Sequence, residues 1–428
     1  MLDIIRNSAT AAIQRLLRAR TSTLAEAEAV VRPILDDVRR RGDRALGRYM
    51  KKFDHVDLRK TGFTVSRQET RRAYREVPGG FVAAVRAAAA NIRKAARRQL
   101  PRPWTARTSA GVRVGQVIRP LDRVACYVPG GRFPLPSTVL MSVIPAQEAG
   151  VREVLVTSPR PAPAVLVAAD LLGVEKVFRL GGAQAVAAFA YGTESVPRVD
   201  KIVGPGNRYV ATAKKLVAGE CGIDFIAGPS ELVLVAVRGE AEWIASDLVA
   251  QAEHDPDAVA IFITPSPKLA LQVQAAVSGI LARLILPVAE RALQAQGGII
   301  VTRDLREATD LVNRLAPEHL ALLEGATCLL PHVQSAGSIF LGAYSPVAAG
   351  DYASGTNHIL PTGGAARLRG GLSAADFVKT VSVQRLSREG LAGLRKTIVT
   401  LAQTEGLQAH AYSVDTRFEP RDEERASK

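Results

Sequence analysis

The feature that most constrains the fold of this chain is a long alternation of short apolar runs with segments of helical pattern, from about residue 124 to about residue 323. Strands that alternate with helices predict a mostly parallel sheet covered by helices on both faces. The expected strands are 124–128, 154–157, 176–180, 201–203, 232–237, 259–264, 298–301 and 319–323. The expected helices are 139–149, 164–172, 183–190, 207–216, 240–254, 269–296 and 305–315. The predicted fold class is therefore α/β.

Outside this region the sequence predicts helical extensions. Residues 1–20 have the pattern of an amphipathic helix, residues 87–98 have high helix propensity, and the segment after about residue 374 is helix-rich with a polar end. A length of 428 residues suits two large lobes with extensions. The expected boundaries are 1–23 for an N-terminal helical extension, 24–126 with 232–373 for a first, discontinuous α/β lobe, 127–231 for a second α/β lobe, and 374–428 for a C-terminal helical tail.

Composition excludes several classes of protein. No apolar run approaches the ~18 residues that span a bilayer, and the first residues lack the apolar core and the small-residue cleavage site of a secretory signal. The three cysteines, Cys126, Cys221 and Cys328, form no CxxC pair, which disfavours a cysteine zinc site or a disulfide framework. Isolated thiols suit a reducing compartment. We therefore expect a cytoplasmic protein without a membrane partner.

The net charge of +15 arises almost entirely in the first 100 residues, which contain 23 Lys and Arg against 10 Asp and Glu. A basic region of this kind attracts nucleic acid, an anionic membrane or an acidic cofactor. The alternative is a solvated, Arg-rich helical surface. The sequence contains no zinc finger, no RNP motif and no basic stretch interleaved with aromatic residues. The solvated surface is therefore the favoured interpretation, and no nucleic-acid partner is expected.

Histidine is rare in this chain, and its distribution is uneven. Five of the six histidines follow residue 250, and four of those five lie in segments with acidic or amide side chains. Histidine transfers protons near neutral pH and is a frequent metal ligand. This distribution predicts one site assembled from distant segments, and a cation with a base-catalysed redox step would account for it.

Two residues of the helix expected at 240–254 form the first candidate pair. Gln251 and His254 are three positions apart, which places both side chains on one helical face. Pro256 disfavours helical geometry in the residue before it, so the helix should end near His254. Such a pair can reach a metal ion, but the spacing alone favours a polar last turn with a surface histidine.

Glu318 and His319 form the second candidate pair. They follow Pro317, a residue that favours the first turn of a helix. A carboxylate beside an imidazole can supply general bases for two proton transfers. The alternative is a capping carboxylate with an incidental histidine, and this pair alone is a weak signal.

Two further segments carry candidate groups. Asp351 lies among small and turn-forming residues at 349–358, which let a carboxylate approach a ligand closely or cap a tight turn. Glu405 and His410 lie near the C-terminus, where reactive groups would need to be held in place, for example against a partner subunit. The alternative for Glu405 and His410 is a disordered polar tail.

Glycine-rich turns follow three of the expected strands, at 129–131, 181–182 and 204–207. A glycine turn that opens a helix exposes backbone N–H groups suited to a pyrophosphate. No turn has the GxGxxG pattern and no Walker motif is present, so nucleotide binding is allowed but not demonstrated.

At these residues the chain resembles the histidinol dehydrogenase family. The resemblance covers most of the chain and is strongest from about residue 124 to residue 413. The blocks that carry it are 127–132, 181–188, 203–209, 227–231, 251–257, 316–320, 350–358 and 405–410. Many long blocks in one family's order are much stronger evidence than any single motif above.

The resemblance implies a zinc- and NAD-dependent enzyme that oxidises L-histidinol to L-histidine through histidinal, the last steps of histidine biosynthesis. His319 matches the base that removes the alcohol proton, and Glu318 matches the residue that activates water. The implied metal ligands are Gln251, His254, Asp351 and His410. The implied substrate contacts are Ser230, Gln251, His254, His319, Asp351, Glu405 and His410. The implied NAD contacts are Tyr127, Gln184 and Asn207.

The resemblance also implies an architecture and an assembly. It predicts two incomplete Rossmann-like lobes in an aldehyde-dehydrogenase-like arrangement, with residues 127–231 on the NAD side. It predicts a homodimer in which the C-terminal tail completes the partner's site, so that Glu405 and His410 act in the neighbouring subunit. No cysteine thioester is required, and Cys126 is expected to be a small buried residue.

Two features depart from the family pattern. The family commonly has Ser-Pro-Glu before the metal-binding aspartate, whereas this chain has Ser345, Pro346 and Val347. The segment 323–334 is also shorter than usual. Loss of a carboxylate near the site can alter metal tuning or amine recognition. A related zinc and NAD alcohol dehydrogenase acting on another small polar alcohol therefore remains the alternative function.

Overall fold

The computed structural model describes residues 2–6, 24–130, 133–226 and 228–419. The chain divides into two compact units. The main unit takes in Met1–Leu100 and Leu121–Phe377, and the small unit takes in Pro101–Pro120 and Val378–Lys428. Within the described residues, no helix has both the length and the apolar character needed to cross a bilayer.

A five-stranded parallel sheet forms one half of the main unit, in the order β6-β5-β4-β7-β8. Its strands are β4 (Arg123–Tyr127), β5 (Glu153–Thr157), β6 (Val177–Phe178), β7 (Lys201–Val203) and β8 (Gly222–Ile223). The chain runs outward from β4 to β6 and then returns to place β7 on the other side of β4. The carboxyl ends of β4 and β7 therefore form a topological switch point, where open α/β sheets bind ligands.

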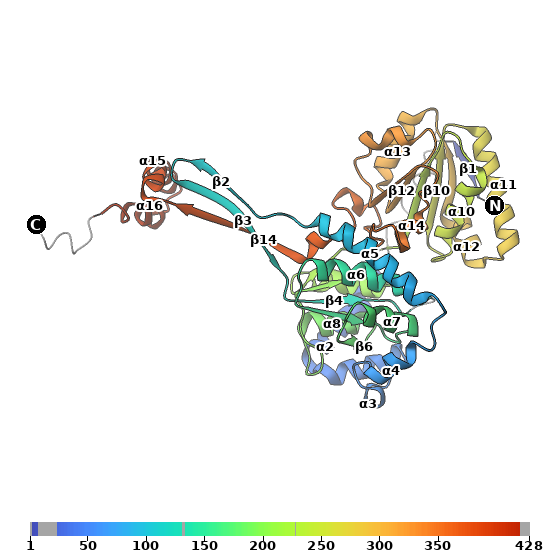
Figure 1. Cartoon of the computed structure of the whole chain (residues 1–428), viewed down its shortest axis with the longest axis horizontal. Helices are drawn as coiled ribbons and strands as arrows, with labels where there is room; N and C mark the ends of the chain where they lie inside the picture. Colours follow the sequence, from blue (N-terminus) through green and yellow to red (C-terminus); the bar gives the residue numbers. More distant parts are fainter. Residues whose placement is uncertain (1, 7–23, 131–132, 227, 420–428) are drawn as a thin grey trace, which may run out of the picture. The chain divides into compact units, whose positions relative to one another are not determined.

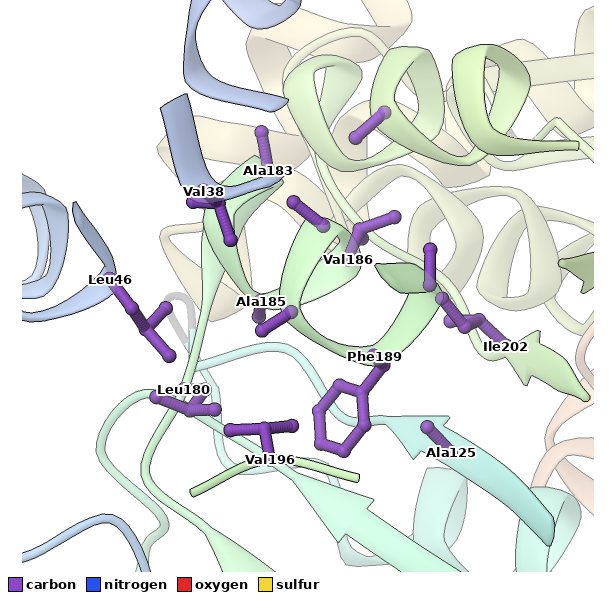
Figure 2. Close-up of a cluster of buried hydrophobic side chains, with 14 of the residues drawn as sticks. Val38, Leu46, Ala125, Leu180, Ala183, Ala185, Val186, Phe189, Val196 and Ile202 are labelled. Atoms are coloured by element: carbon purple, nitrogen blue, oxygen red, sulfur yellow. The ribbon is translucent and has the colours of Figure 1, made fainter. Parts of the chain in front are cut away.

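Helices cover both faces of this sheet because its strands are apolar on both sides. One core cluster joins Ala125, Leu155 and Ile202 to one set of helices, and Figure 2 shows part of it around Phe189. A second cluster joins Val124, Val156 and Val203 to the opposite set. The first set is α2 (Leu24–Phe53), α8 (Gly182–Tyr191) and α9 (Arg208–Val217). The second set is α5 (Phe81–Gln99), α6 (Pro136–Glu148) and α7 (Pro163–Leu171).

A six-stranded parallel sheet forms the other half of the main unit, in the order β1-β11-β10-β9-β12-β13. Its strands are β1 (Ile4–Arg6), β9 (Glu231–Val235), β10 (Val259–Thr264), β11 (Gly297–Val301), β12 (His319–Leu322) and β13 (Ser338–Leu341). One face is covered by α10 (Ala241–Ala252), α11 (Pro267–Leu284) and α12 (Pro287–Gln296), and the other by α13 (Leu305–Leu315) (Figure 1). A short helix, α14 (Val347–Tyr352), packs against α10.

The small unit is built on an antiparallel sheet in the order β14-β3-β2. Its elements are β2 (Trp104–Ser109), β3 (Val112–Pro120), β14 (Val378–Leu386), α15 (Arg388–Thr404) and α16 (Gln408–Asp415). The register pairs Val378 with Pro120 and Leu386 with Val112. Short helical pieces complete the main unit, namely α3 (Leu58–Thr61), α4 (Arg67–Ala73), η1 (Thr327–His332), η2 (Ala365–Arg367) and η3 (Ala374–Phe377).

The predicted α/β class with parallel sheets is confirmed, but the structure corrects three expectations. Residues Ile4–Arg6 form an edge strand rather than part of a helix, and 7–23 lie outside the described residues. The helices between residues 24 and 99, together with β4, pack into the two cores of the five-stranded sheet and not, as expected, into those of the six-stranded sheet. The C-terminal tail begins with the long strand β14, which is stabilised by backbone pairing to β3.

Candidate functional site

Chain direction brings most of the candidate residues to the amino edge of the six-stranded sheet. Ser230 directly precedes β9, Glu318 directly precedes β12, and His319 is the first residue of β12, paired in register with Leu232. Helix α10 returns from the end of β9 to the start of β10, as any connection between parallel neighbours must. The C-terminal end of α10, which carries Gln251 and His254, therefore reaches the same edge.

Glu318 and His319 are not helical, contrary to the interpretation of Pro317 as a first-turn residue. Helix α13 ends at Ala316, which adopts a left-handed conformation with φ 44°. The chain then enters β12, where His319 is 4% exposed and Glu318 just before it is 5% exposed. The change of direction at Ala316 thus places a carboxyl group and an imidazole side by side in the interior.

The buried imidazole of His319 lies between two carboxyl groups. Its Nδ1 atom is 3.1 Å from the carbonyl oxygen of Glu231 and 3.5 Å from Oε2 of Glu318. Its Nε2 atom is 3.4 Å from Oδ1 of Asp351, and among the described residues this buried nitrogen has no partner with hydrogen-bond geometry. A buried polar atom without a partner at such a position is suited to meeting a ligand.

Charge and burial act against each other in this group. Burial favours the neutral imidazole, but the carboxyl groups of Glu318 and Asp351 outweigh it and raise the pKa of His319 to about 10. Burial raises the pKa of Glu318, although the neighbouring His319 opposes that shift. The raised pKa favours the protonated imidazole near neutral pH, and its close contact with two acidic groups is an arrangement typical of acid–base chemistry.

Asp351 connects the predicted metal ligands of the main unit. It lies in the last turn of α14. Burial would raise the pKa of Asp351, but the imidazoles of His319, His358 and His254 lower it. Gln251 is buried in the last turn of α10, and His254 is exposed just beyond the end of that helix. Three of the four expected ligands thus come from two helices that pack together.

The remaining expected residues of this set belong to the small unit. Glu405 caps the C-terminus of α15, and His410 lies in α16; both side chains are exposed. Within the described part of the chain, no cluster of three or more His, Cys, Asp or Glu side chains has the spacing to hold a metal ion. The expected set includes only two residues of those types in the main unit, His254 and Asp351. An amide oxygen, imidazole nitrogens and a carboxylate are nevertheless donors that suit zinc.

The three predicted NAD contacts lie on the five-stranded sheet, along its carboxyl edge. Tyr127 ends β4, and its hydroxyl oxygen accepts a hydrogen bond of 3.1 Å from the backbone N–H of Gly182. Gln184, in the first turn of α8, donates to Oδ2 of Asp54 at 2.8 Å. Asn207 caps the N-terminus of α9. The ends of β4 and β7 and the starts of α8 and α9 therefore meet at the switch point.

Comparison with known proteins agrees with this arrangement. The family model described as histidinol dehydrogenase matches residues 17–418. The chain belongs to the histidinol dehydrogenase family.

Individual members of the family match at similar lengths. The histidinol dehydrogenase of Syntrophotalea carbinolica is 49% identical over 91% of this chain and 92% of its own length. That of Methanothermobacter thermautotrophicus is 48% identical over the same shares. A crystal structure of histidinol dehydrogenase from Elizabethkingia anophelis superposes with a TM-score of 0.92 at 35% identity, covering 97% of this chain and 98% of that one.

Two residues near the site were not predicted by the sequence reasoning. The backbone N–H of Glu231 donates to Glu318 Oε2 at 2.6 Å, and Oε1 of Glu231 accepts from the backbone of Gly363 at 2.9 Å. His358 Nδ1 lies 2.8 Å from the carbonyl oxygen of Asp351. Both residues fall inside blocks shared with the family. In the sequence, Glu231 follows Ser230 and His358 lies shortly after Asp351. These positions suggest that both residues are near the site, but they do not predict which atoms they contact.

The departure at Val347 has a structural consequence. Val347 begins α14 and is buried in the same apolar core as Phe340, whose ring lies 5.9 Å from the His319 ring with a tilt of 31°. The position at which the family resemblance led us to expect a carboxylate is therefore occupied by a buried apolar side chain. Asp351 and His319 keep their contact without that carboxylate.

Proposed function

We propose that this chain is a zinc-dependent, NAD-linked L-histidinol dehydrogenase that forms L-histidine through L-histidinal. The observation that carries the proposal is the buried His319 imidazole held 3.5 Å from Glu318 and 3.4 Å from Asp351, beside the helix end that carries Gln251 and His254. Family membership supports the reaction class, because it makes the chain an oxidoreductase.

The proposed metal site uses the residues that the resemblance implies. Gln251, His254 and Asp351 would hold zinc together with His410. Bound zinc would orient the substrate through its imidazole and amino nitrogens and polarise the reacting oxygen. Ser230, at the amino end of β9, and Glu405 are proposed to contact the same substrate.

His319 is proposed to move protons in both oxidations. It accepts them as the neutral imidazole, which the positive charge of zinc held by Asp351 would favour. In the first oxidation, it accepts the hydroxyl proton of histidinol while the hydrogen on the carbon leaves as hydride. Glu318 then removes a proton from water, which adds to the aldehyde carbon and gives the hydrated aldehyde. In the second oxidation, His319 accepts a proton from that hydrate as a second hydride leaves, and the acid results. One water is consumed, and each hydride passes to one NAD.

The cofactor is proposed to bind along the carboxyl edge of the five-stranded sheet, with Tyr127, Gln184 and Asn207 as contacts. Helix N-termini at the switch point present backbone N–H groups to a pyrophosphate. The hydrogen bond from Gln184 to Asp54 fixes the amide orientation. These contacts supply binding and orientation, whereas the proton transfers belong to the other sheet.

We further propose a cytoplasmic homodimer in which Glu405 and His410 complete the site of the partner subunit. Support comes from the small unit, which exposes large apolar side chains on its strands and helices. They are Trp104, Val381, Val383, Leu401, Leu407 and Tyr412. A cluster of exposed apolar side chains on one small unit is typical of a surface that a partner covers.

The second candidate is a related alcohol dehydrogenase that uses the same metal and base residues on another small polar alcohol. The observation in its favour is Val347, which replaces a carboxylate near the site with a buried apolar side chain.

An absorbance assay of NADH formation with histidinol, histidinal and a panel of small alcohols separates the two, with metal analysis of the same sample. Turnover of histidinol that is lost with a chelator and restored by zinc supports the first proposal. Steady turnover of another alcohol, with none on histidinol, would select the second.

A further inference from the structure

Beside the proposed cofactor edge, the main unit contains an ion pair that is almost completely buried. The Lys214 side chain is 2% exposed and the Asp224 side chain is 0% exposed, and the two are in direct contact. Lys214 lies in α9, and Asp224 directly follows β8. Removing two charges from water costs several kcal/mol each, so a buried pair is seldom explained by stability alone.

Both members of the pair bind the same backbone residue. The Nζ atom of Lys214 donates to the carbonyl oxygen of Gly204 at 2.9 Å. The backbone N–H of Gly204 donates to Oδ2 of Asp224 at 2.7 Å. Gly204 directly follows β7 and begins the turn 204–207, which leads into the N-cap Asn207. The pair thus fixes both polar backbone groups of the residue at which this turn leaves the sheet.

Gly204 has little freedom to move. Its φ of 111° is strained for any residue with a side chain, and a Cβ atom here would lie 2.2 Å from the carbonyl oxygen of Tyr127. The turn therefore packs directly on the end of β4. A shift of Gly204 would displace the turn from Tyr127 and would also move Asn207, and these are two of the three proposed NAD contacts.

Further hydrogen bonds hold Asp224 in place. Oδ1 of Asp224 accepts from the backbone N–H of Phe225 at 2.7 Å, and the carbonyl oxygen of Asp224 accepts from Nη1 of Arg369 at 2.5 Å. Arg369 is held in turn by Asp376, whose Oδ1 lies 2.6 Å from Nη2. These hydrogen bonds restrain Asp224, and Asp224 in turn restrains the backbone of Gly204.

We propose that Lys214 and Asp224 are positioning residues for the cofactor, which hold the turn 204–207 in the conformation that receives NAD. The inference rests on the proposed NAD-linked function. Neither side chain needs to touch the cofactor, because each acts through the backbone of Gly204.

The test is the double variant Lys214→Met with Asp224→Asn, which keeps the side-chain volumes and leaves no unpaired buried charge. The variant loses the Lys214 donor and the ion pair, and it keeps only a neutral amide acceptor for the Gly204 N–H. We expect the KM for NAD and the dissociation constant of NADH to rise roughly tenfold or more. The KM for histidinol and the zinc content should be unchanged, and kcat at saturating NAD should be retained. NADH binding is measured by fluorescence titration without substrate, and folding by circular dichroism.

A matched control removes an ion pair from the opposite edge of the same sheet. Arg123 and Glu153 contact each other at the amino ends of β4 and β5. The double variant Arg123→Met with Glu153→Gln should bind NADH as the wild type does. A merely structural role for the Lys214–Asp224 pair predicts the same result for both double variants.

A folded Lys214/Asp224 double variant with wild-type NADH affinity would overturn the inference and leave the proposed function intact. If that variant does not fold, Gly204→Ala replaces it, because the added methyl group displaces the same turn; unchanged NADH binding there would also overturn the inference. Failure of the wild-type enzyme to reduce NAD with histidinol would refute the proposed function instead.

Discussion

In the proposed function, the two parallel sheets of the main unit use opposite edges. The proposed cofactor site lies at the carboxyl edge of the five-stranded sheet, where Tyr127 ends a strand and Asn207 begins a helix. The proposed chemistry lies at the amino edge of the six-stranded sheet, where His319 begins β12 and Gln251 lies in the last turn of α10. The first edge follows the general rule for open α/β sheets, and the second does not.

The two edges differ in the chemical groups that line them. The proposed cofactor edge is built from backbone groups and glycine, such as Gly182 and Gly204, which let the chain pack closely. The edge proposed for chemistry is built from titratable side chains in the interior, with His319 between Glu318 and Asp351. Substitutions at the first edge should therefore change binding, and substitutions at the second should change proton transfer.

The largest effect is expected for His319→Asn, which removes the proposed general base and keeps the polar volume. Oxidation of histidinal should fall roughly 10²- to 10⁴-fold, the range attributed to general base catalysis. NADH affinity should stay within about twofold, because independent sites do not couple. Both are measured, the first by absorbance and the second by fluorescence titration. Loss of NADH affinity in parallel with the rate would remove the distinction between the edges.

The next effect in size is expected for Glu318→Gln. Glu318 is buried, and its Oε2 accepts from the backbone N–H of Glu231, which the amide oxygen of glutamine can still do. The loss of the base should slow formation of the acid roughly 10²-fold or more while some oxidation of the alcohol continues. Product analysis should show histidinal accumulating. Full production of histidine would refute the role given to Glu318.

Sharing of the site between subunits is expected to produce partial recovery. His410→Asn and His319→Asn should each be inactive alone. Mixed dimers would contain one intact site if His410 serves the partner, so an equilibrated 1:1 mixture should recover about a quarter of wild-type activity. The measurement is activity after co-refolding, with each variant refolded alone as the control. Absence of recovery would place His410 in its own subunit's site.

A several-fold effect is expected for Asn207→Ala at the cofactor edge. Asn207 Oδ1 accepts from the backbone of Tyr209 and Val210, both at 3.1 Å. Loss of this cap should cost about 1 kcal/mol of unfolding free energy and raise the KM for NAD. The control is Ser266→Ala, which removes the cap of α11 on the other sheet and should not change that KM. Equal effects of the two variants would show that the cap serves stability alone.

The smallest effect is expected at Cys126. Burial raises the pKa of its thiol to about 12, and the side chain is fully enclosed between β4 and α6. Cys126→Ala should retain activity and cost about 1 kcal/mol of stability from the small cavity. Alkylation with iodoacetamide should reach the exposed Cys328 first. A Cys126→Ala enzyme that folds normally but is inactive would show that the thiol takes part in the reaction.

The sequence predicted the sheets well and the extensions poorly. Helix α13 was expected at 305–315, which is where it lies, because its apolar spacing, its N-cap Asp304 and the break at Pro317 agree. Strand β14 was missed although Val381 and Val383 alternate with polar residues. Its stability comes from β3, which is distant in sequence, and both valines are exposed in the chain. Local patterns do not identify a partner strand of that kind.

The residues of the candidate site likewise differ in whether local sequence patterns could predict their contacts. Helical spacing places Gln251 and His254 at one helix end, but that spacing alone favours a surface histidine, and their assignment as metal ligands comes from the family resemblance. The contact between His319 and Asp351 could not be predicted, since it depends on the placement of α14 over the start of β12. The hydrogen bond from Glu231 to Glu318 likewise requires two adjacent strands to begin at the same level.

The central claim is that one buried base serves two successive oxidations in a single site. It is tested most directly by counting the NADH formed per molecule of histidinol consumed by the zinc-loaded enzyme, with histidine and histidinal measured in the same reaction. The proposed function predicts two NADH and one histidine, with no free histidinal accumulating. One NADH per histidinol, with histidinal as the final product, would contradict it.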